Sequence, residues 1–224
     1  MSQYYFAPSI LSADFNRLGE QIAQTKEGGA QYVHIDVMDG VFVPNLTFGM
    51  PVIKSIRSET DLVFDVHLMV QTPRKLIERI ALAGADIITF HIEATDDPGA
   101  CIAAIHEQGK KVGLALKPST PIEAAVPYLQ RIDMLLVMTV EPGYGGQKYI
   151  DASTQRIRQA RRIVDESGLD VDIEVDGGIT RDTIDIVTDA GANVIVAGSA
   201  VYRGDACENT RWFAEHLGIL PEEG

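Results

Sequence analysis

The amino-acid sequence predicts an α/β protein in which residues 1–224 form a single (β/α)8 TIM barrel domain. Three observations lead to this prediction. Eight short apolar runs alternate with helix-like stretches, and no linker or low-complexity segment separates them. One helix-to-strand turn recurs, with the sequences Gly28-Gly29-Ala30, Gly84-Ala85 and Gly191-Ala192. Sharing 224 residues among eight units gives 28 residues each, which suits a compact barrel.

The expected strands are short runs rich in β-branched residues. In chain order they cover residues 5–10, 32–37, 62–68, 87–91, 111–116, 134–138, 171–175 and 194–197. Because strands and helices alternate along the chain, a parallel sheet is expected. In a barrel of this kind the functional residues lie at the carboxyl ends of the strands.

Capping residues and breakers mark the clearest helices. Asp14 can cap the first helix, Pro73 lies in the first turn of another, and Gly191 follows the last residue of a third. In chain order these helices are expected over residues 14–26, 72–83, 153–166 and 181–190.

An open, doubly wound sheet is the alternative architecture. Its G-x-G-x-x-G fingerprint is missing after the first strand, where the sequence reads Pro8-Ser9-Ile10-Leu11-Ser12-Ala13.

Composition and charge restrict the class of protein. The chain is 46% hydrophobic and 23% charged, with a formal net charge of -13. This negative charge argues against nucleic acid and anionic membranes as partners, and it makes anion sites depend on backbone N–H groups or a few cations. Cys101 and Cys207 form no CxxC motif. No apolar run approaches the roughly 18 residues that a membrane span requires. The first residues do not have the composition of a signal peptide. A cytoplasmic protein is therefore expected.

The second expected strand carries the first candidate site. Alternate side chains along a strand share a face, so His34, Asp36 and Met38 point the same way. An imidazole beside a carboxylate can hold a divalent cation, and the carboxylate can also move a proton. The alternative is a core strand with a hydrogen-bonded histidine and a carboxylate that caps a turn.

Two other strand ends carry the same residue types. His67 shares a face with Met69 at the end of the third strand, and Asp176 ends the seventh. Together with His34 and Asp36 they supply two imidazoles and two carboxylates, a donor set suited to Zn²⁺, Fe²⁺, Mn²⁺ or Co²⁺. A hydrogen-bonded polar layer in the core is the alternative.

The remaining histidines are weaker candidates for this site. His91 ends the fourth strand and could line the pocket, although a role in the following loop is the expectation. His106 and His216 fall on helices and are expected to face solvent.

Glycine-rich turns follow the sixth, seventh and eighth strands. Gly177-Gly178 and Gly198-Ser199 stand where barrels commonly bind phosphate through the backbone. The turn at residues 142–148 lacks the ending of a P-loop and is interpreted as a mobile flap that closes over a substrate. Plain strand-to-helix geometry is the alternative for each turn taken alone.

Three methionines are expected at the same end of the barrel. Met38, Met69 and Met138 all end strands, and together they predict an apolar wall beside a charged intermediate. Core filling is the alternative role for any one of them.

The motifs together resemble those of the ribulose-phosphate 3-epimerase family, in family order and over nearly the whole chain. They are Ala7-Pro8-Ser9-Ile10-Leu11-Ser12-Ala13-Asp14-Phe15, His34-Ile35-Asp36-Val37-Met38-Asp39-Gly40, Val66-His67-Leu68-Met69, Met138-Thr139-Val140-Glu141-Pro142-Gly143, Glu174-Val175-Asp176-Gly177-Gly178-Ile179 and Ala197-Gly198-Ser199-Ala200. The departures are small, since Tyr144 and Tyr149 stand where the family frequently has Phe.

This resemblance implies a ribulose-phosphate-binding barrel that interconverts D-ribulose 5-phosphate and D-xylulose 5-phosphate in the pentose phosphate pathway. It implies one divalent metal ion per subunit, held by His34, Asp36, His67 and Asp176, with Asp36 and Asp176 as the paired acid and base. It also implies a homodimer or homohexamer. The residues that the resemblance places against the substrate are Ser9, His67, Gly143, Tyr144, Gly145, Gly146, Asp176, Gly177, Gly178, Gly198 and Ser199.

Epimerisation at C3 requires a proton to leave one face of the carbon and return to the other. Two carboxylates on opposite sides achieve this without turning the intermediate over, and a bound cation would act as a Lewis acid for the C2 and C3 oxygens. The resemblance suggests that Asp36 faces the proton of D-ribulose 5-phosphate.

Three other functions are compatible with parts of the pattern. An epimerase of a six-carbon ketose phosphate, such as allulose 6-phosphate, would share the metal and the acids. A Schiff-base aldolase would use Lys117 after the fifth strand, although a loop lysine is expected there. A sugar-phosphate sensor without catalysis is the third.

Overall fold

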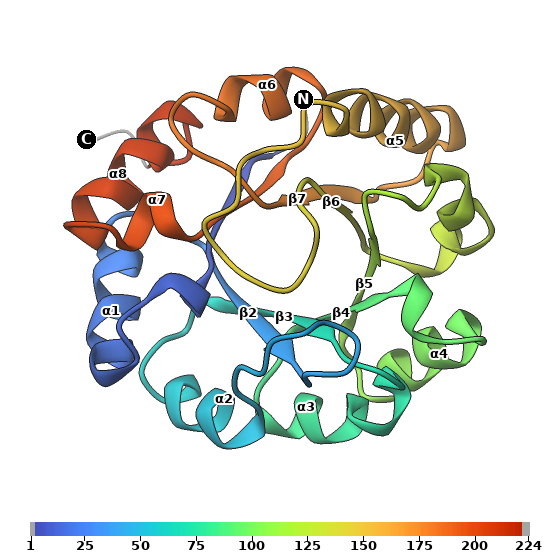
Figure 1. The fold of residues 1–224 in the computed structure, drawn as a ribbon, viewed down its shortest axis with the longest axis horizontal. Coiled ribbons are helices and arrows are strands. Elements are labelled where there is room, and N and C mark those ends of the chain that lie inside the picture. Colours follow the sequence, from blue (N-terminus) through green and yellow to red (C-terminus); the bar gives the residue numbers. More distant parts are fainter. Residues whose placement is uncertain (1–2, 221–224) are drawn as a thin grey trace.

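The computed structural model describes residues 3–220, which form a barrel of parallel strands surrounded by helices (Figure 1). The strands are β1 (Tyr5–Pro8), β2 (Tyr32–Met38), β3 (Val63–Met69), β4 (Ile87–His91), β5 (Lys111–Leu116), β6 (Met134–Met138), β7 (Asp172–Asp176) and β8 (Val194–Ala197). They pair in the order β1-β8-β7-β6-β5-β4-β3-β2. An isolated parallel bridge between Ser9 and His34 joins the two ends of this sheet, and the predicted (β/α)8 barrel is confirmed.

Helices cover the outside of the barrel. The α-helices are α1 (Leu18–Glu27), α2 (Met50–Arg57), α3 (Ile77–Ala83), α4 (Pro98–Glu107), α5 (Ser153–Ser167), α6 (Ile184–Asp189), α7 (Ser199–Tyr202) and α8 (Ala206–His216). The 3-10 helices are η1 (Ile10–Ser12), η2 (Phe15–Arg17), η3 (Pro73–Lys75), η4 (Ile92–Ala94) and η5 (Ile122–Arg131). Within residues 3–220, no helix has the length and apolar character that crossing a membrane requires.

The alternation predicted for β2 is present in the barrel. All seven residues of this strand are buried, because helices cover its outer face and side chains fill the interior. Val33, Ile35 and Val37 belong to the main apolar core, whereas His34 and Asp36 face inward with other polar groups. The strand therefore delivers its polar side chains to the interior of the barrel.

Several predicted boundaries differ from the structure. The first strand ends at Pro8, not at residue 10, because Ser9 accepts a hydrogen bond from the Leu11 N–H and starts η1. The helix expected from residue 14 begins with η2, whose N-cap is Asp14, before α1. The helix expected over residues 72–83 starts at Pro73, because Thr72 has the left-handed φ of 62°, and it is divided at Leu76, whose φ is -107°, into η3 and α3.

The segment between β5 and β6 is a ten-residue 3-10 helix, η5. Pro127 lies inside it, and proline removes an N–H donor and clashes with the preceding turn of an α-helix. The helix expected over residues 181–190 is shorter, because the Thr183 hydroxyl accepts from the Thr180 N–H in a turn that precedes α6.

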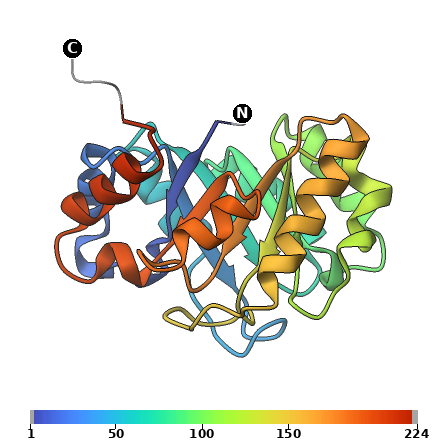
Figure 2. The ribbon, with the colours of Figure 1, turned by 90° about the horizontal axis from the view of Figure 1, so that it is seen from above.

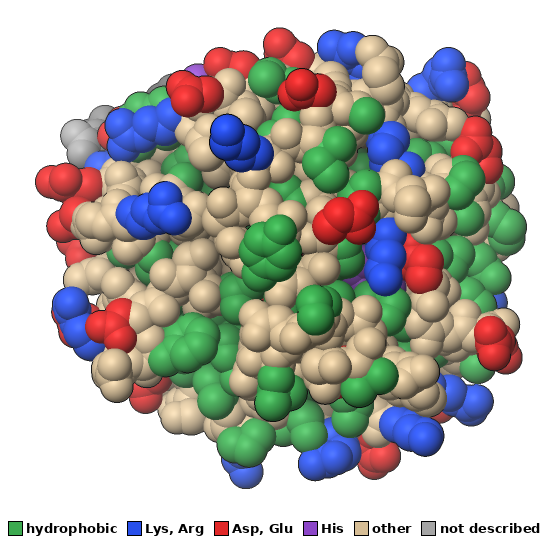
Figure 3. All heavy atoms as spheres, viewed as in Figure 1, with side chains coloured by type: hydrophobic (Ala, Val, Ile, Leu, Met, Phe, Trp, Pro, Cys, Tyr) green, Lys and Arg blue, Asp and Glu red, His purple; other side chains and the backbone are tan. Residues whose placement is uncertain are grey.

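The carboxyl ends of the strands form one open end of the barrel. The loops after β2 and β6 project furthest from this end (Figure 2). They carry exposed apolar side chains, among them Val41, Leu46 and Tyr144. In the space-filling view of this face most charged side chains lie toward the periphery, and the histidines are almost entirely hidden (Figure 3).

Candidate active site

A pocket of about 610 Å³ lies at the carboxyl ends of the strands. Fourteen of the sequence-predicted site residues are among those that line it: Ser9, Asp36, Met38, Met69, Met138, Gly143, Tyr144, Gly145, Gly146, Asp176, Gly177, Gly178, Gly198 and Ser199. His34 and His67 are fully buried beneath it. The barrel therefore gathers residues from six strand ends into one place.

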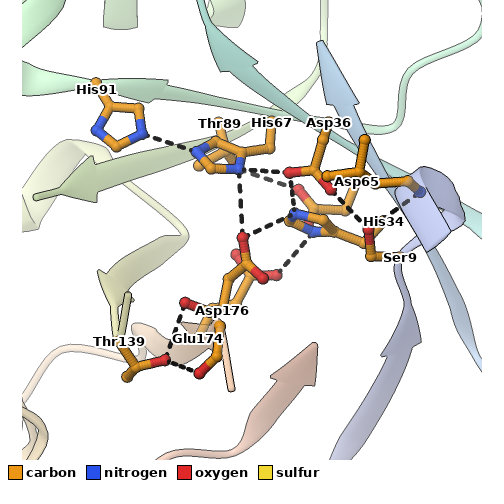
Figure 4. A network of polar contacts seen from close by, with 12 residues as sticks. Ser9, His34, Asp36, Asp65, His67, Thr89, His91, Thr139, Glu174 and Asp176 are labelled. Atoms are coloured by element: carbon orange, nitrogen blue, oxygen red, sulfur yellow. Dashed lines mark hydrogen bonds and ion pairs between the residues drawn. The ribbon is translucent and has the colours of Figure 1, made fainter. Parts of the chain in front are cut away.

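Strand register brings the four candidate metal ligands together (Figure 4). Asp36 of β2 is paired with His67 of β3, and Asp176 comes from β7 across the barrel. One ligand atom from each of these residues and from His34 lies within 4.8 Å of the others. The four side chains thus converge, as the sequence predicted.

The distances within this cluster suit a small divalent cation. His34 Nε2 lies 3.3 Å from Asp36 Oδ1 and 3.7 Å from Asp176 Oδ2. His67 Nδ1 lies 3.1 Å and 3.7 Å from the same two oxygens. Ligands about 2.0–2.1 Å from a tetrahedral ion are separated by roughly 3.3 Å.

An unsatisfied nitrogen supports the same interpretation. His34 Nε2 is buried and makes no hydrogen bond within the described part of the chain. Its approach to Asp36 lacks the direction that a hydrogen bond requires. A buried polar atom without a partner is costly, and coordination of a cation would satisfy it. The residues therefore fit the ion that the sequence implied.

The two pocket carboxylates have different proton affinities. Burial opposes ionisation of Asp36, but the charge of His34, together with the hydrogen bond and charge of His67, holds the pKa of Asp36 well below its usual value. Burial, and then the negative charge of Asp36, raises the pKa of Asp176 to about 6. Asp36 is thus the stronger acid of the pair and Asp176 is more easily protonated.

Ser9 acts directly on one of these carboxylates. Its hydroxyl donates to Asp36 Oδ2 at 2.6 Å, leaving Oδ1 directed toward the two histidines. Asp39, three residues beyond Asp36 and outside the pocket lining, accepts from the N–H groups of Val41, Phe42 and Gln71. It stabilises the turn after β2.

A second polar layer beneath the pocket was missed by the sequence analysis. His34 Nδ1 lies 2.6 Å from Asp65 Oδ2, and the Thr89 hydroxyl donates to Asp65 Oδ1 at 3.0 Å. Burial, followed by the charge of Asp65, raises the pKa of Glu174 well above its usual value. Asp65 and Glu174 stand two residues before His67 and Asp176, so period-2 alternation was the signal that could have found them.

His91 contacts both the candidate site and the segment that follows its strand. Its Nδ1 lies 3.2 Å from Glu93 Oε2 in η4, in line with the role expected in the following loop. The ring is also fully buried, and its Nε2 lies 2.9 Å from His67 Nε2. The cause is again alternation, because His91 follows Thr89 by two residues on the inward face of β4. His106 and His216 are exposed on α4 and α8, as predicted.

The apolar and glycine residues complete the pocket. Met38 and Met69 are neighbours across β2 and β3, and both are nearly inaccessible to solvent, as is Met138.

Lys117 is not among the residues lining this pocket, and its ammonium lies 3.9 Å from the centre of the Phe42 ring. The loop position expected for Lys117 is confirmed, and the structure gives no support to a Schiff-base role in this pocket.

Comparisons with known proteins agree with this architecture. A model of the ribulose-phosphate 3 epimerase family matches residues 5–202. A Bacillus subtilis (strain 168) protein named ribulose-phosphate 3-epimerase is 49% identical over 197 residues, covering 88% of this chain and 91% of that protein. An Escherichia coli (strain K12) protein of the same name is 46% identical over 203 residues, covering 90% of each chain.

Solved structures with low sequence identity share the fold. KGPDC from Streptococcus mutans matches with a TM-score of 0.72 at 14% identity, covering 97% of this chain and 98% of that chain. A 3-hexulose-6-phosphate synthase matches with a TM-score of 0.69 at 19% identity, covering 98% of this chain and 100% of the other. The family match and the curated relatives show that the chain belongs to the ribulose-phosphate 3-epimerase family, a family of isomerases.

Proposed function

We propose that this enzyme interconverts D-ribulose 5-phosphate and D-xylulose 5-phosphate by removing the C3 proton and returning one to the opposite face. The observation that carries the proposal is the pair of carboxylates, Asp36 and Asp176, which reach one pocket from strands on opposite sides of the barrel. The names of the curated relatives support this choice of substrate.

The two carboxylates would act as base and acid. Asp36, whose pKa is held low, starts ionised and takes the C3 proton of D-ribulose 5-phosphate. Asp176 is the more easily protonated of the two and, in its protonated form, delivers a proton to the other face. The roles exchange in the reverse direction.

His34, Asp36, His67 and Asp176 would hold one divalent ion, which, when bound, stabilises the negative charge that develops on the substrate oxygens. Their nitrogen and carboxylate donors accept Zn²⁺, Fe²⁺, Mn²⁺ or Co²⁺. Ser9 orients the Asp36 carboxylate through its hydrogen bond to Oδ2. Met38, Met69 and Met138 would exclude water from the same region.

The substrate phosphate would bind at the backbone of the turns after β7 and β8. Among the described residues that line the pocket there is no lysine or arginine, so a phosphate there depends on N–H groups. Gly177 and Gly178 have φ values of 118° and 70°, and a Cβ on Gly178 would lie 2.3 Å from the backbone nitrogen of Tyr149. Glycine is therefore required for this close approach of two chain segments.

Gly178→Ala should raise the KM for ketose phosphate about tenfold or more, since the new methyl group must displace the Tyr149 backbone and costs at least about 1–2 kcal/mol. Steady-state kinetics give the measurement. Gly109→Ala is a matched control, because Gly109 has a similar φ of 66° but nothing within 4 Å of a new Cβ. An unchanged KM in Gly178→Ala would argue against phosphate binding at this turn.

Substrate length provides the direct test of the proposed reaction. A six-carbon ketose phosphate such as allulose 6-phosphate has one more carbon between the reacting centre and the phosphate. If both ends of the pocket are fixed, C3 is displaced by more than 1 Å, which can cost about 10²-fold in rate. We expect kcat/KM for D-ribulose 5-phosphate to exceed that for allulose 6-phosphate by at least about this factor.

Reversed efficiencies would instead assign the enzyme to the six-carbon substrate, and equal efficiencies would show that it does not discriminate between the two. Binding of D-ribulose 5-phosphate without C3 exchange in heavy water would indicate a sensor. Action in the pentose phosphate pathway, a cytoplasmic location and assembly as a homodimer or homohexamer complete the proposal.

A further inference from the structure

We propose that His91 and Glu93 form a positioning pair, which fixes the ring nitrogen that His67 directs toward the candidate metal position. The pair would thereby set the affinity for a divalent ion without touching the substrate. This inference rests on the proposed function in one respect, namely that His67 is a metal ligand.

The geometry around His67 assigns a separate partner to each ring nitrogen. Its Nδ1 faces Asp36 and Asp176, at 3.1 Å and 3.7 Å, whereas its Nε2 lies 2.9 Å from Nε2 of His91 (Figure 4). Of two imidazole nitrogens in contact, one must donate and the other accept. A lone pair on Nδ1 of His67, free for a cation, requires the proton on Nε2, which then donates to His91.

The same argument applies to the next group in the chain of hydrogen bonds. With its Nε2 accepting, His91 carries its own proton on Nδ1, which lies 3.2 Å from Glu93 Oε2. Each proton position is thus determined by the next group, ending at a carboxylate. Without an acceptor at His91, the tautomer of His67 with the lone pair on Nδ1 would lose its stabilising hydrogen bond.

Glu93 is itself held in place by the loop after β5, which α5 supports in turn. Its Oε1 accepts from the Lys117 N–H at 2.8 Å and from the Thr120 hydroxyl, in the loop after β5. Arg156 of α5 donates to the carbonyl oxygens of Thr120 and Lys117, at 2.5 Å and 2.9 Å. The end of the chain of hydrogen bonds is therefore anchored outside the pocket.

The other histidine of the cluster has an independent support, which makes the comparison informative. His34 directs Nε2 to the cluster and Nδ1 to Asp65, so the two imidazoles use opposite nitrogens. Partners of this kind orient metal-binding histidines, and their loss typically costs about 10–100-fold in metal affinity. His91 would orient the ring of His67 in the way that Asp65 orients the ring of His34.

The test is competitive titration of metal-free protein with Zn²⁺ against a chromophoric chelator. His91→Phe, which fills the space but accepts no hydrogen bond, should weaken Zn²⁺ binding by about 10–100-fold. His91→Gln keeps an acceptor near the former Nε2 position and should bind within about threefold of wild type. Phe90→Leu is the control for lost packing on β4, because Phe90 is buried in the apolar core outside the barrel, and its affinity should not change.

Two results would overturn the proposal: wild-type affinity in a folded His91→Phe protein, or equal losses in His91→Phe and His91→Gln. If His91→Phe does not fold, Glu93→Ala tests the proposal in its place. A several-fold loss of Zn²⁺ affinity is expected in that variant, and an unchanged affinity would contradict the proposed role of the pair. Failure of wild-type protein to bind Zn²⁺ would instead refute the metal site of the proposed function, which separates the two hypotheses.

Discussion

Asp36→Asn and Asp176→Asn are each expected to lose about 10²–10⁴-fold in epimerisation rate while remaining folded. An amide has nearly the shape of the carboxylate but neither takes nor returns a proton at this pH. Both side chains line the same pocket, and no other described lining residue except Glu141 carries a carboxylate. Turnover of D-ribulose 5-phosphate gives the rate, and circular dichroism with thermal unfolding checks the fold.

Isotope exchange in heavy water can separate the roles of the two residues. In Asp176→Asn the remaining Asp36 can remove the C3 proton of D-ribulose 5-phosphate and return deuterium to the same face, giving exchange without epimerisation. In Asp36→Asn the same behaviour is expected only with D-xylulose 5-phosphate. This crossed pattern follows from the proposed placement of Asp36 and Asp176 on opposite sides of C3, so that each can exchange the proton of only one epimer.

A matched control lies on the same strand as Asp176. Asp172 begins β7, at the opposite end of the barrel, where it accepts from Asn193 Nδ2 at 2.6 Å. Asp172→Asn should keep near wild-type turnover. The metal content of every variant must be measured as well, because an amide is a weaker ligand than a carboxylate. Near wild-type epimerisation in either active-site variant would exclude the two-carboxylate scheme.

Much of the barrel could be predicted because its strands are buried on both faces. Short apolar runs such as Met134–Met138 have few alternatives to a core strand, and β4, β5, β6 and β8 have the predicted bounds. The predicted ends of the helices are less accurate, because a helix end depends on competition between helical hydrogen bonds and local turns. Thr72 adopts a left-handed φ and Thr183 forms a side-chain turn, and neither effect leaves a periodic pattern in the sequence.

The site was predictable to the extent that its residues stand at strand ends. His34, Asp36, His67 and Asp176 have the donor types of a metal site, and the barrel topology makes the ends of their strands meet. Sequence periodicity also gives the face of a side chain, but it gives neither its depth in the barrel nor its partner across the strands.

The layer around His34 and His67 shows this limit. Asp65 and Glu174 share the strand faces of the predicted residues, yet only the register of β2, β3 and β7 shows that they lie beneath His34. His91 ends β4, and its position in the sequence predicts a role in the loop that follows. Its contact with His67 depends on how two side chains are oriented across neighbouring strands, which one sequence does not contain.

Removal of divalent ions should lower turnover of D-ribulose 5-phosphate by about 10³-fold, and addition of Zn²⁺, Mn²⁺, Co²⁺ or Fe²⁺ should restore it. A cation contributes several kcal/mol of charge stabilisation, and each 1.36 kcal/mol corresponds to a factor of ten in rate. The cluster supplies the reason for expecting binding, because His34 Nε2 has no partner among residues 3–220 and four donors lie within 4.8 Å. Dialysis against a chelator, followed by metal analysis and kinetics, is the measurement.

A second, non-kinetic readout makes this expectation independent of catalysis. An ion that binds the folded state alone stabilises it by about 2.7 kcal/mol at a concentration of 100 Kd, so Zn²⁺ should raise the Tm of the metal-free protein. His34→Gln should reduce both the rise in Tm and the recovery of turnover, whereas His216→Gln, on the exposed surface of α8, should retain both. Full turnover in protein shown to contain no metal would mean that Asp36 and Asp176 move the proton with the buried histidines as their only electrostatic support.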